Sequence, residues 1–147
     1  MKYCFLPLVI IFPVLISVYL IGETVLNAFY VAGCLKFIYS SHSTFLINSV
    51  AHTWGSRPYD KNITARNNRF VSLFALGEGW HNYHHAFPRD YKTSEFGLYR
   101  WNLSAALIDF FACIGWAYDL QKTRPDEIEK RVNRTADKSI HENQLLG

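Results

Sequence analysis

Paired cysteines and basic patches, which would mark two common classes of small protein, are missing from this chain. Its 147 residues include only three cysteines, Cys4, Cys34 and Cys113. The odd count and wide spacing exclude a readable disulfide framework or zinc ribbon, so the thiols are expected to be buried small hydrophobic groups. No Lys/Arg patch is interleaved with a nucleic-acid-binding pattern, so nucleic acid is not a predicted partner.

Charge is scarce in the first third of the chain. Residues 3–22 carry no charged side chain, and the uncharged runs 24–35 and 37–56 are separated only by Lys36. A bilayer core of ~30 Å needs ~20 apolar residues of helix. We therefore predict a hairpin of two transmembrane helices over residues 1–54, turning at Gly22-Glu23. A cleaved secretory signal is the alternative, but the first run exceeds the usual ~7–15 residues and no small-residue cleavage site follows it.

Basic residues gather in the later part of the chain. Only two of the fifteen Lys and Arg residues precede Ser56, and these residue types favour the cytoplasmic side of a membrane. We expect Lys2 and everything after about His52 to be cytosolic, with a helical cap at residues 55–124 and a charged tail, helical or disordered, at 125–147. The predicted fold class is an all-α integral membrane protein.

A further apolar stretch covers residues 102–120. Its length would allow it to span a bilayer. However, Asp109 near its middle and an amphipathic pattern favour a helix packed on the cytosolic domain or lying at the membrane interface.

The main candidate site is the segment His81-Asn82-Tyr83-His84-His85. In a helix, His81, His84 and His85 fall at positions i, i+3 and i+4 and share one face. Neutral imidazole is the commonest nitrogen ligand for zinc, copper, nickel and iron, so the cluster predicts a metal site. The alternative is a polar helix end whose histidines bond to backbone or water.

The end of the preceding long helix offers further candidates. Asn48 and His52 are four residues apart and share a face, and Phe45 lies one turn earlier. We predict that Asn48 and His52 face the histidine cluster. For His52 a capped interfacial histidine remains an equal alternative, and for Asn48 a helix–helix hydrogen bond is favoured by the sequence pattern alone. Glu78 could orient an imidazole or be solvated.

The motifs around these residues are long and specific. They read Asn48-Ser49-x-Ala51-His52-x-Trp54-Gly55-x-Arg57-Pro58-Tyr59-Asp60-Lys61, and then Gly77-Glu78-Gly79-Trp80-His81-Asn82-Tyr83-His84-His85-x-Phe87-Pro88. From about residue 6 to about residue 124 the chain resembles the membrane acyl-CoA desaturases, of the stearoyl-CoA Δ9 type and insect-like. The resemblance implies a multi-pass enzyme of the endoplasmic reticulum membrane with a cytosolic cap. It also implies oxygen-dependent desaturation of a fatty acyl-CoA at two irons, supplied with electrons by an NADH-dependent reductase and a b-type cytochrome.

The resemblance also assigns roles to single residues. His52, His81, His84 and His85 match metal ligands, and Asn48 matches a position that reaches a metal through water. Phe45 stands where many members carry Trp near the substrate, which puts that contact in doubt, and Trp80 replaces the usual Phe. The protein would supply position and ligands while the metals carry the oxidative chemistry.

The chain departs from the family pattern in what it lacks. The family's first two histidine boxes, H-x-x-x-x-H and H-x-x-H-H, are absent, and only two of four expected membrane helices are visible. We therefore expect about half of a two-metal site, in the C-terminal part of a longer desaturase or in a truncated product, with little turnover alone. The alternatives are an inactive membrane protein that binds lipid or a partner, and a different metalloenzyme such as a fatty-acid hydroxylase or a zinc hydrolase.

Overall fold

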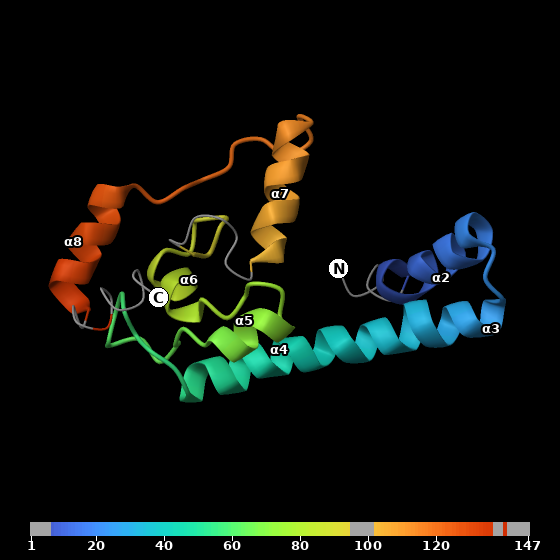
Figure 1. Cartoon of the computed structure of the whole chain (residues 1–147), viewed down its shortest axis with the longest axis horizontal. Coiled ribbons are helices and arrows are strands. Elements are labelled where there is room, and N and C mark those ends of the chain that lie inside the picture. Colours follow the sequence, from blue (N-terminus) through green and yellow to red (C-terminus); the bar gives the residue numbers. More distant parts are fainter. Residues whose placement is uncertain (1–6, 95–101, 137–139, 141–147) are drawn as a thin grey trace. The chain divides into compact units, whose positions relative to one another are not determined.

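The structure is a computed structural model, and it describes residues 7–94, 102–136 and 140 (Figure 1). These residues form helices joined by loops, and their only β-pairing consists of isolated bridges at Ser56–Asn67 and Asn67–Trp80. The all-α prediction is confirmed for them. The chain divides into two compact units, Met1–Thr44 and Phe45–Gly147. The expected three-part division at residues 54 and 124 stays a prediction.

The first unit is a pair of helical stretches joined by a tight turn. The first stretch contains η1 (Pro7–Ile11), α2 (Phe12–Ile16) and η2 (Ser17–Ile21); the second contains α3 (Val25–Ala28), η3 (Phe29–Leu35) and the beginning of α4 (Lys36–Thr53). Gly22 ends the first stretch at a φ of 80°, a left-handed conformation that glycine adopts without a steric penalty. Thr24 Oγ1 then accepts from Asn27 N at 3.3 Å and caps α3.

The two stretches of the first unit pack closely. A Cβ atom at Gly33 would lie 3.4 Å from side-chain carbons of Ile10 and Val14, so the small residue allows the helices to approach. Lys36 Nζ also donates to Val9 O at 3.1 Å. The first unit thus pairs two helical stretches, but the predicted hairpin of two transmembrane helices over residues 1–54 stays a prediction. Within the described residues, every helix falls short of the length and apolarity that a membrane span requires, and the predicted membrane crossing stays a prediction.

The second unit contains short helices that follow the end of α4. They are α5 (Arg69–Phe74), α6 (His81–Ala86), α7 (Leu103–Cys113) and α8 (Pro125–Thr135). Two begin at asparagine caps, because Asn68 Oδ1 accepts from Val71 N at 3.1 Å and Asn102 Oδ1 accepts from Ala105 N at 2.9 Å. The helix expected over 102–120 is shorter than predicted, ending at Cys113 just before Gly115, whose φ is 78°.

Two small apolar clusters hold this unit together. One contains Tyr59, Tyr83, Ile128 and Val132, and the other contains Ala51, Val71 and Ala75. The first cluster joins α8 to the loop before α5 and to α6. Arg131 of α8 also pairs with the nearly buried Asp60 at 2.6 Å. Of the two alternatives for the tail, the helical one is correct up to Thr135.

Candidate metal centre

Three histidines from two helices converge in the second unit. His81 Nε2 lies 3.0 Å from His52 Nε2 and 3.1 Å from His85 Nε2. The three ligand atoms all lie within 4.8 Å of one another, so this group could hold a metal ion. Two nitrogens bound to one metal at about 2.1 Å lie roughly 3.0 Å apart when they subtend a right angle. The spacings from His81 to His52 and from His81 to His85 each fit a pair of nitrogens that share an ion.

Two histidines of the cluster, His81 and His85, have lowered pKa values, which favours the neutral form that binds a metal. His81 is 7% exposed. Burial, followed by the nearby charges of His85, His52 and His84, lowers the pKa of His81 from 6.5 to about 4. Burial and the same kind of repulsion, from His84 and His52, also lower the pKa of His85. At neutral pH the lone pairs of His81 and His85 are therefore available without displacing a proton.

Thr64 orients the His52 ring. The Nδ1 atom of His52 lies 3.1 Å from Thr64 Oγ1. With its proton on Nδ1, the ring donates to this hydroxyl and directs the Nε2 lone pair toward His81. A hydrogen bond to the second ring nitrogen is the usual device that fixes the tautomer and direction of a metal-binding histidine.

His84 lies beside the convergent group but not within it. Its ring stacks on His81 with centroids 5.8 Å apart, whereas the group of ligand atoms contains only His52, His81 and His85. His84 Nδ1 is buried and has no hydrogen-bond partner among the described residues. An unpaired buried nitrogen is unfavourable unless something else satisfies it, and a metal ligand role would do so.

The remaining predicted site residues lie on α4. Asn48 is exposed one turn before His52, and Phe45 is 66% exposed about two turns before it. Their expected contacts, with metal through water and with substrate, stay predictions.

Buried asparagines hold the histidine helix at its first turn. The side chain of Asn82, 0% exposed, accepts from the backbone N atoms of Tyr59 and Asp60 at 2.9 and 3.2 Å and donates to Asp60 O and Ala65 O, both at 2.9 Å. Asn67 Oδ1 accepts from Asn82 N at 3.0 Å. The first turn of α6 is thus fixed to the loop at residues 59–67 by side-chain hydrogen bonds.

Glycine allows the close approach of the chain before α6. A Cβ atom on Gly79 would lie 2.1 Å from Ser72 N and 2.3 Å from Asn68 O. Gly77 has a φ of 114°, and a Cβ there would lie 2.4 Å from Asn102 Oδ1. Glycine is therefore needed at residues 77 and 79, where the chain leaves α5 and enters the histidine helix α6.

Sequence reasoning missed Thr64, Asn67 and Asn82 as supports of the site. In the sequence, Thr64 is the last residue of the N-glycosylation acceptor pattern Asn62-Ile63-Thr64, which gives no indication of a contact with His52. Asn82 stands inside the histidine segment, and asparagine is a poor choice for a helix interior unless its side chain has backbone partners. An asparagine inside a predicted helix was therefore the sequence feature that could have indicated this hydrogen-bond network.

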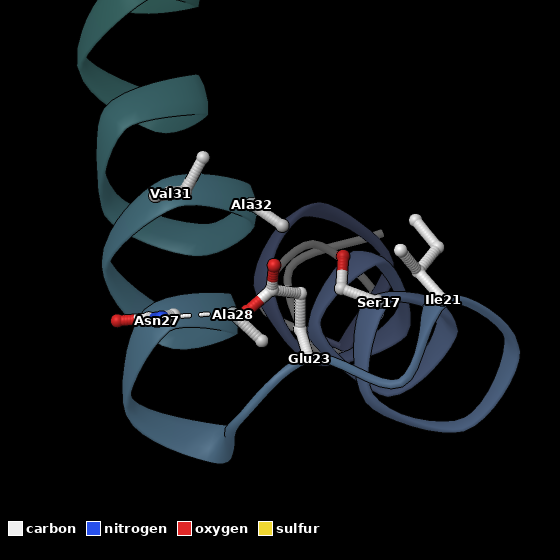
Figure 2. A pocket seen from close by; sticks show the side chains of 7 residues that line it. All are labelled: Ser17, Ile21, Glu23, Asn27, Ala28, Val31 and Ala32. Carbon is white, nitrogen blue, oxygen red and sulfur yellow. Dashed lines mark hydrogen bonds between the residues drawn. The ribbon is translucent and has the colours of Figure 1, made fainter.

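A separate hollow lies in the first unit, beside the turn of the hairpin. It has a volume of about 470 Å³, and Ser17, Glu23 and Asn27 supply its polar lining (Figure 2). Asn27 Nδ2 donates to Glu23 Oε2 at 3.4 Å across its edge. No histidine lines it, so it is a different feature from the metal-ligand cluster.

Comparison with known proteins gives a consistent family. The sequence model of the fatty acid desaturase family matches residues 2–119. The chain is 53% identical over 127 residues to an acyl-CoA Delta-9 desaturase of Acheta domesticus, covering 86% of this chain and 35% of that protein. It is 47% identical to an acyl-CoA Delta(11) desaturase of Choristoneura rosaceana (86% and 38% covered) and 49% identical to acyl-CoA desaturase 3 of Mus musculus (88% and 36%). The chain thus spans little more than a third of the length of these relatives.

Proposed function

The chain belongs to the fatty acid desaturase family, and from this premise we propose that it carries part of the iron centre of an acyl-CoA desaturase. The reaction would introduce a cis double bond into a fatty acyl-CoA. It removes two hydrogen atoms from adjacent methylene groups and reduces O2 to two water molecules, with two further electrons and two protons to complete the balance. The relatives' names support an acyl-CoA substrate, and they differ in bond position (Delta-9, Delta-12, Delta-11).

One observation carries the proposal: the convergence of His52, His81 and His85 at Nε2 distances of 3.0 and 3.1 Å. All three rings are imidazoles, a donor type that suits iron. When bound, iron would supply the activation of dioxygen that removal of hydrogen from an unactivated methylene requires. The residues of this chain would hold the ion, favour the neutral form of His81 and His85 through their burial, and fix the direction of the His52 ring through Thr64.

The number of donors sets what the isolated chain is expected to do. Four imidazoles, counting His84, fill only part of the coordination of two irons. We therefore expect the 147-residue chain to bind iron and to turn over little by itself. Asn48, through water, and Phe45, toward the acyl chain, are proposed as further contacts because they lie on the helix that carries His52.

We further propose a location and electron donors for the complete enzyme. The scarcity of charge before Ser56 and the excess of Lys and Arg after it support a multi-pass membrane protein with cytosolic histidines, and the resemblance to the membrane desaturases implies the endoplasmic reticulum. A b-type cytochrome and an NADH-dependent reductase on the same side would then deliver the electrons.

Iron stoichiometry tests the proposal. The purified chain, loaded anaerobically with Fe(II) and desalted, is expected to retain iron, and His81→Ala and His85→Ala are expected to lose most of it. His42→Ala is the matched control, because His42 is exposed on α4 and lies outside the convergent group. If the wild-type chain retains no more iron than the two variants, the lipid- or partner-binding alternative replaces this proposal. A preference for Zn(II) over Fe(II), with hydrolytic activity, would instead favour a zinc hydrolase.

A further inference from the structure

Helix α7 is oriented with its apolar side chains outward. Four large side chains at helical spacing, three on α7 and one on its C-cap residue, form a stripe that is 46–61% exposed: Leu103, Leu107, Phe110 and Ile114. A helix that packs on a soluble core shows the opposite arrangement, with its apolar face inward. We call these four residues the α7 stripe (α7 is the orange helix in Figure 1).

The polar face of α7 is already occupied within the second unit. Asp109 accepts from Tyr91 Oη and pairs with Lys92 Nζ at 3.1 Å. Ala105 is 3% exposed on the same side. Burial acts to lower the pKa of Lys92, but the hydrogen bond and charge of Asp109 and Tyr91 outweigh it and raise that pKa. Because these interactions hold the inward face, α7 cannot bury its stripe against its own unit by rotation.

Further apolar side chains adjoin the beginning of the stripe. The carbonyl oxygen of Leu76 accepts from both N and Oγ of Ser104 at 3.1 Å, which places the end of the α5 region against the first turn of α7. Phe70, Leu73 and Leu76 are themselves exposed. Contiguous apolar surface of this kind is typical of a protein or membrane contact.

The chain beyond the stripe has the composition of a membrane–water interface. Trp116 and Tyr118 follow it and are 74% and 79% exposed. Such rings favour the headgroup level of a bilayer, where their apolar bodies and polar edges are both satisfied.

A basic hollow follows the two aromatic residues along the chain. It has a volume of about 310 Å³ and is lined on its cationic side by Arg89, Lys122 and Arg124. Hydrogen bonds hold the backbone of residues 121–123 at this hollow. Tyr91 N donates to Gln121 O at 3.1 Å, and Thr123 N donates to Asp90 Oδ2 at 2.8 Å. Arg124 forms ion pairs with Asp126 and Glu127. Lys122 Nζ lies over the Tyr91 ring, 5.7 Å from the ring centroid. A headgroup phosphate of a lipid is complementary to this charge.

We propose that the second unit docks on an anionic phospholipid surface, with the α7 stripe in the acyl region and the Arg89–Lys122–Arg124 hollow at the headgroup phosphates. An apolar face with aromatic and basic residues at its end is the arrangement that interfacial helices use to lie in a membrane surface. This surface is distinct from the histidine cluster and does not depend on metal. It would hold the second unit against the bilayer independently of any spanning segment.

Spin-label accessibility tests the proposal in the full chain. Single cysteines are introduced at Leu107 and Phe110 of the stripe and at Glu129, an exposed residue of α8 that serves as control. The background carries Cys4→Ala, Cys34→Ala and Cys113→Ala. Each protein is labelled with a nitroxide and reconstituted in vesicles of phosphatidylcholine with or without phosphatidylserine. Collisions with O2, which concentrates in the acyl region, are compared with collisions with a water-soluble nickel chelate.

The expected result is a higher O2 than nickel accessibility at Leu107→Cys and Phe110→Cys and the reverse at Glu129→Cys. Nickel access at both stripe sites would overturn the proposal, and low access to both reagents would overturn it in favour of a protein cover such as a second copy. In vesicles that contain phosphatidylserine, the double variant Lys122→Gln, Arg124→Gln should reduce the docked population by roughly fivefold for each charge removed. In phosphatidylcholine vesicles it should dock like the wild type. Equal docking of this variant and of the wild type in phosphatidylserine vesicles would refute the role of the hollow. Iron retention by the same samples is expected to be unchanged, which separates this test from that of the proposed function.

Discussion

Replacing Thr64 with valine is the most informative single change to the proposed metal centre. The substitution keeps the shape and β-branching of the side chain and removes the hydroxyl that lies 3.1 Å from His52 Nδ1. The His52 ring then loses the acceptor that fixes its tautomer and direction. We expect the affinity for Fe(II) to fall while the fold is retained, because Thr64 is exposed and makes no contribution to either apolar cluster.

The expected size of the loss follows from the exposure of this contact. Removing a hydrogen-bond partner of a metal-binding histidine typically lowers metal affinity by about 10- to 100-fold. Since Thr64 is exposed, water can replace its hydroxyl as the acceptor, and the loss should lie near the lower end. We therefore expect about tenfold, equivalent to about 1.4 kcal/mol of binding free energy. Loss of a direct ligand, as in His81→Ala, should be much larger.

Anaerobic Fe(II) titration of the purified chain measures this effect, and two controls isolate it. Thr64→Ser restores a hydroxyl and should recover most of the affinity. Asn62→Gln removes the Asn-x-Thr acceptor sequence, as Thr64→Val does, but leaves the hydroxyl in place, so it should bind iron like the wild type. Equal affinities of the valine and serine variants would refute the orienting role, and loss of affinity in Asn62→Gln would point to glycosylation instead.

Two further predictions concern residues that support the site, and a third concerns how stability depends on pH. Asn82→Ala leaves four buried backbone groups without their hydrogen-bond partner, which costs roughly 1–3 kcal/mol for each group that water cannot reach. Urea denaturation should show that the free energy of unfolding falls by several kcal/mol. An unchanged unfolding midpoint would contradict the network. Gly79→Ala places a Cβ 2.1 Å from Ser72 N and should abolish a cooperative unfolding transition, whereas Ala at the open position Gly115, strained only by its φ, should be tolerated better. The pKa of His81 is about 4 in the folded protein, against the ordinary value of 6.5 for the unfolded chain. Between pH 4 and pH 6.5 the unfolded state therefore binds more protons than the folded state. The metal-free protein should lose stability as the pH falls from 6.5 to 4, by at most about 1.4 kcal/mol per pH unit from this group, and His81→Asn should reduce that slope.

The sequence predicted the helices and the histidine cluster where the signal is local. The i, i+3, i+4 spacing indicated a helix with three histidines, and α6 has it. The spacing did not show which two of them meet His52, because positions i+3 and i+4 lie on opposite flanks of position i, about 100° apart. His52 approaches from the flank of His85, so His81 and His85 converge with it while His84 lies to the other side. The partner's direction is a tertiary property that residue spacing cannot supply.

The supports of the site were hidden for a related reason, which also shows how the site is built. Four consecutive residues of one loop bond alternately to the two ligand-bearing helices. Thr64 contacts His52 and Arg66 N donates to Ala51 O at 2.6 Å, both on α4. Ala65 O and Asn67 Oδ1 both accept from Asn82 of α6.

Because successive groups of residues 64–67 bond to different helices, this short segment can fix both helices at once. The relative position of His52 and His81 is then set by residues 64–67 rather than by direct packing of α4 on α6. Each bond joins residues 12 to 17 positions apart in the chain, which no helical or strand periodicity reveals. A ligand geometry held in this way depends on hydrogen bonds more than on apolar burial, which is consistent with the small apolar clusters of this unit.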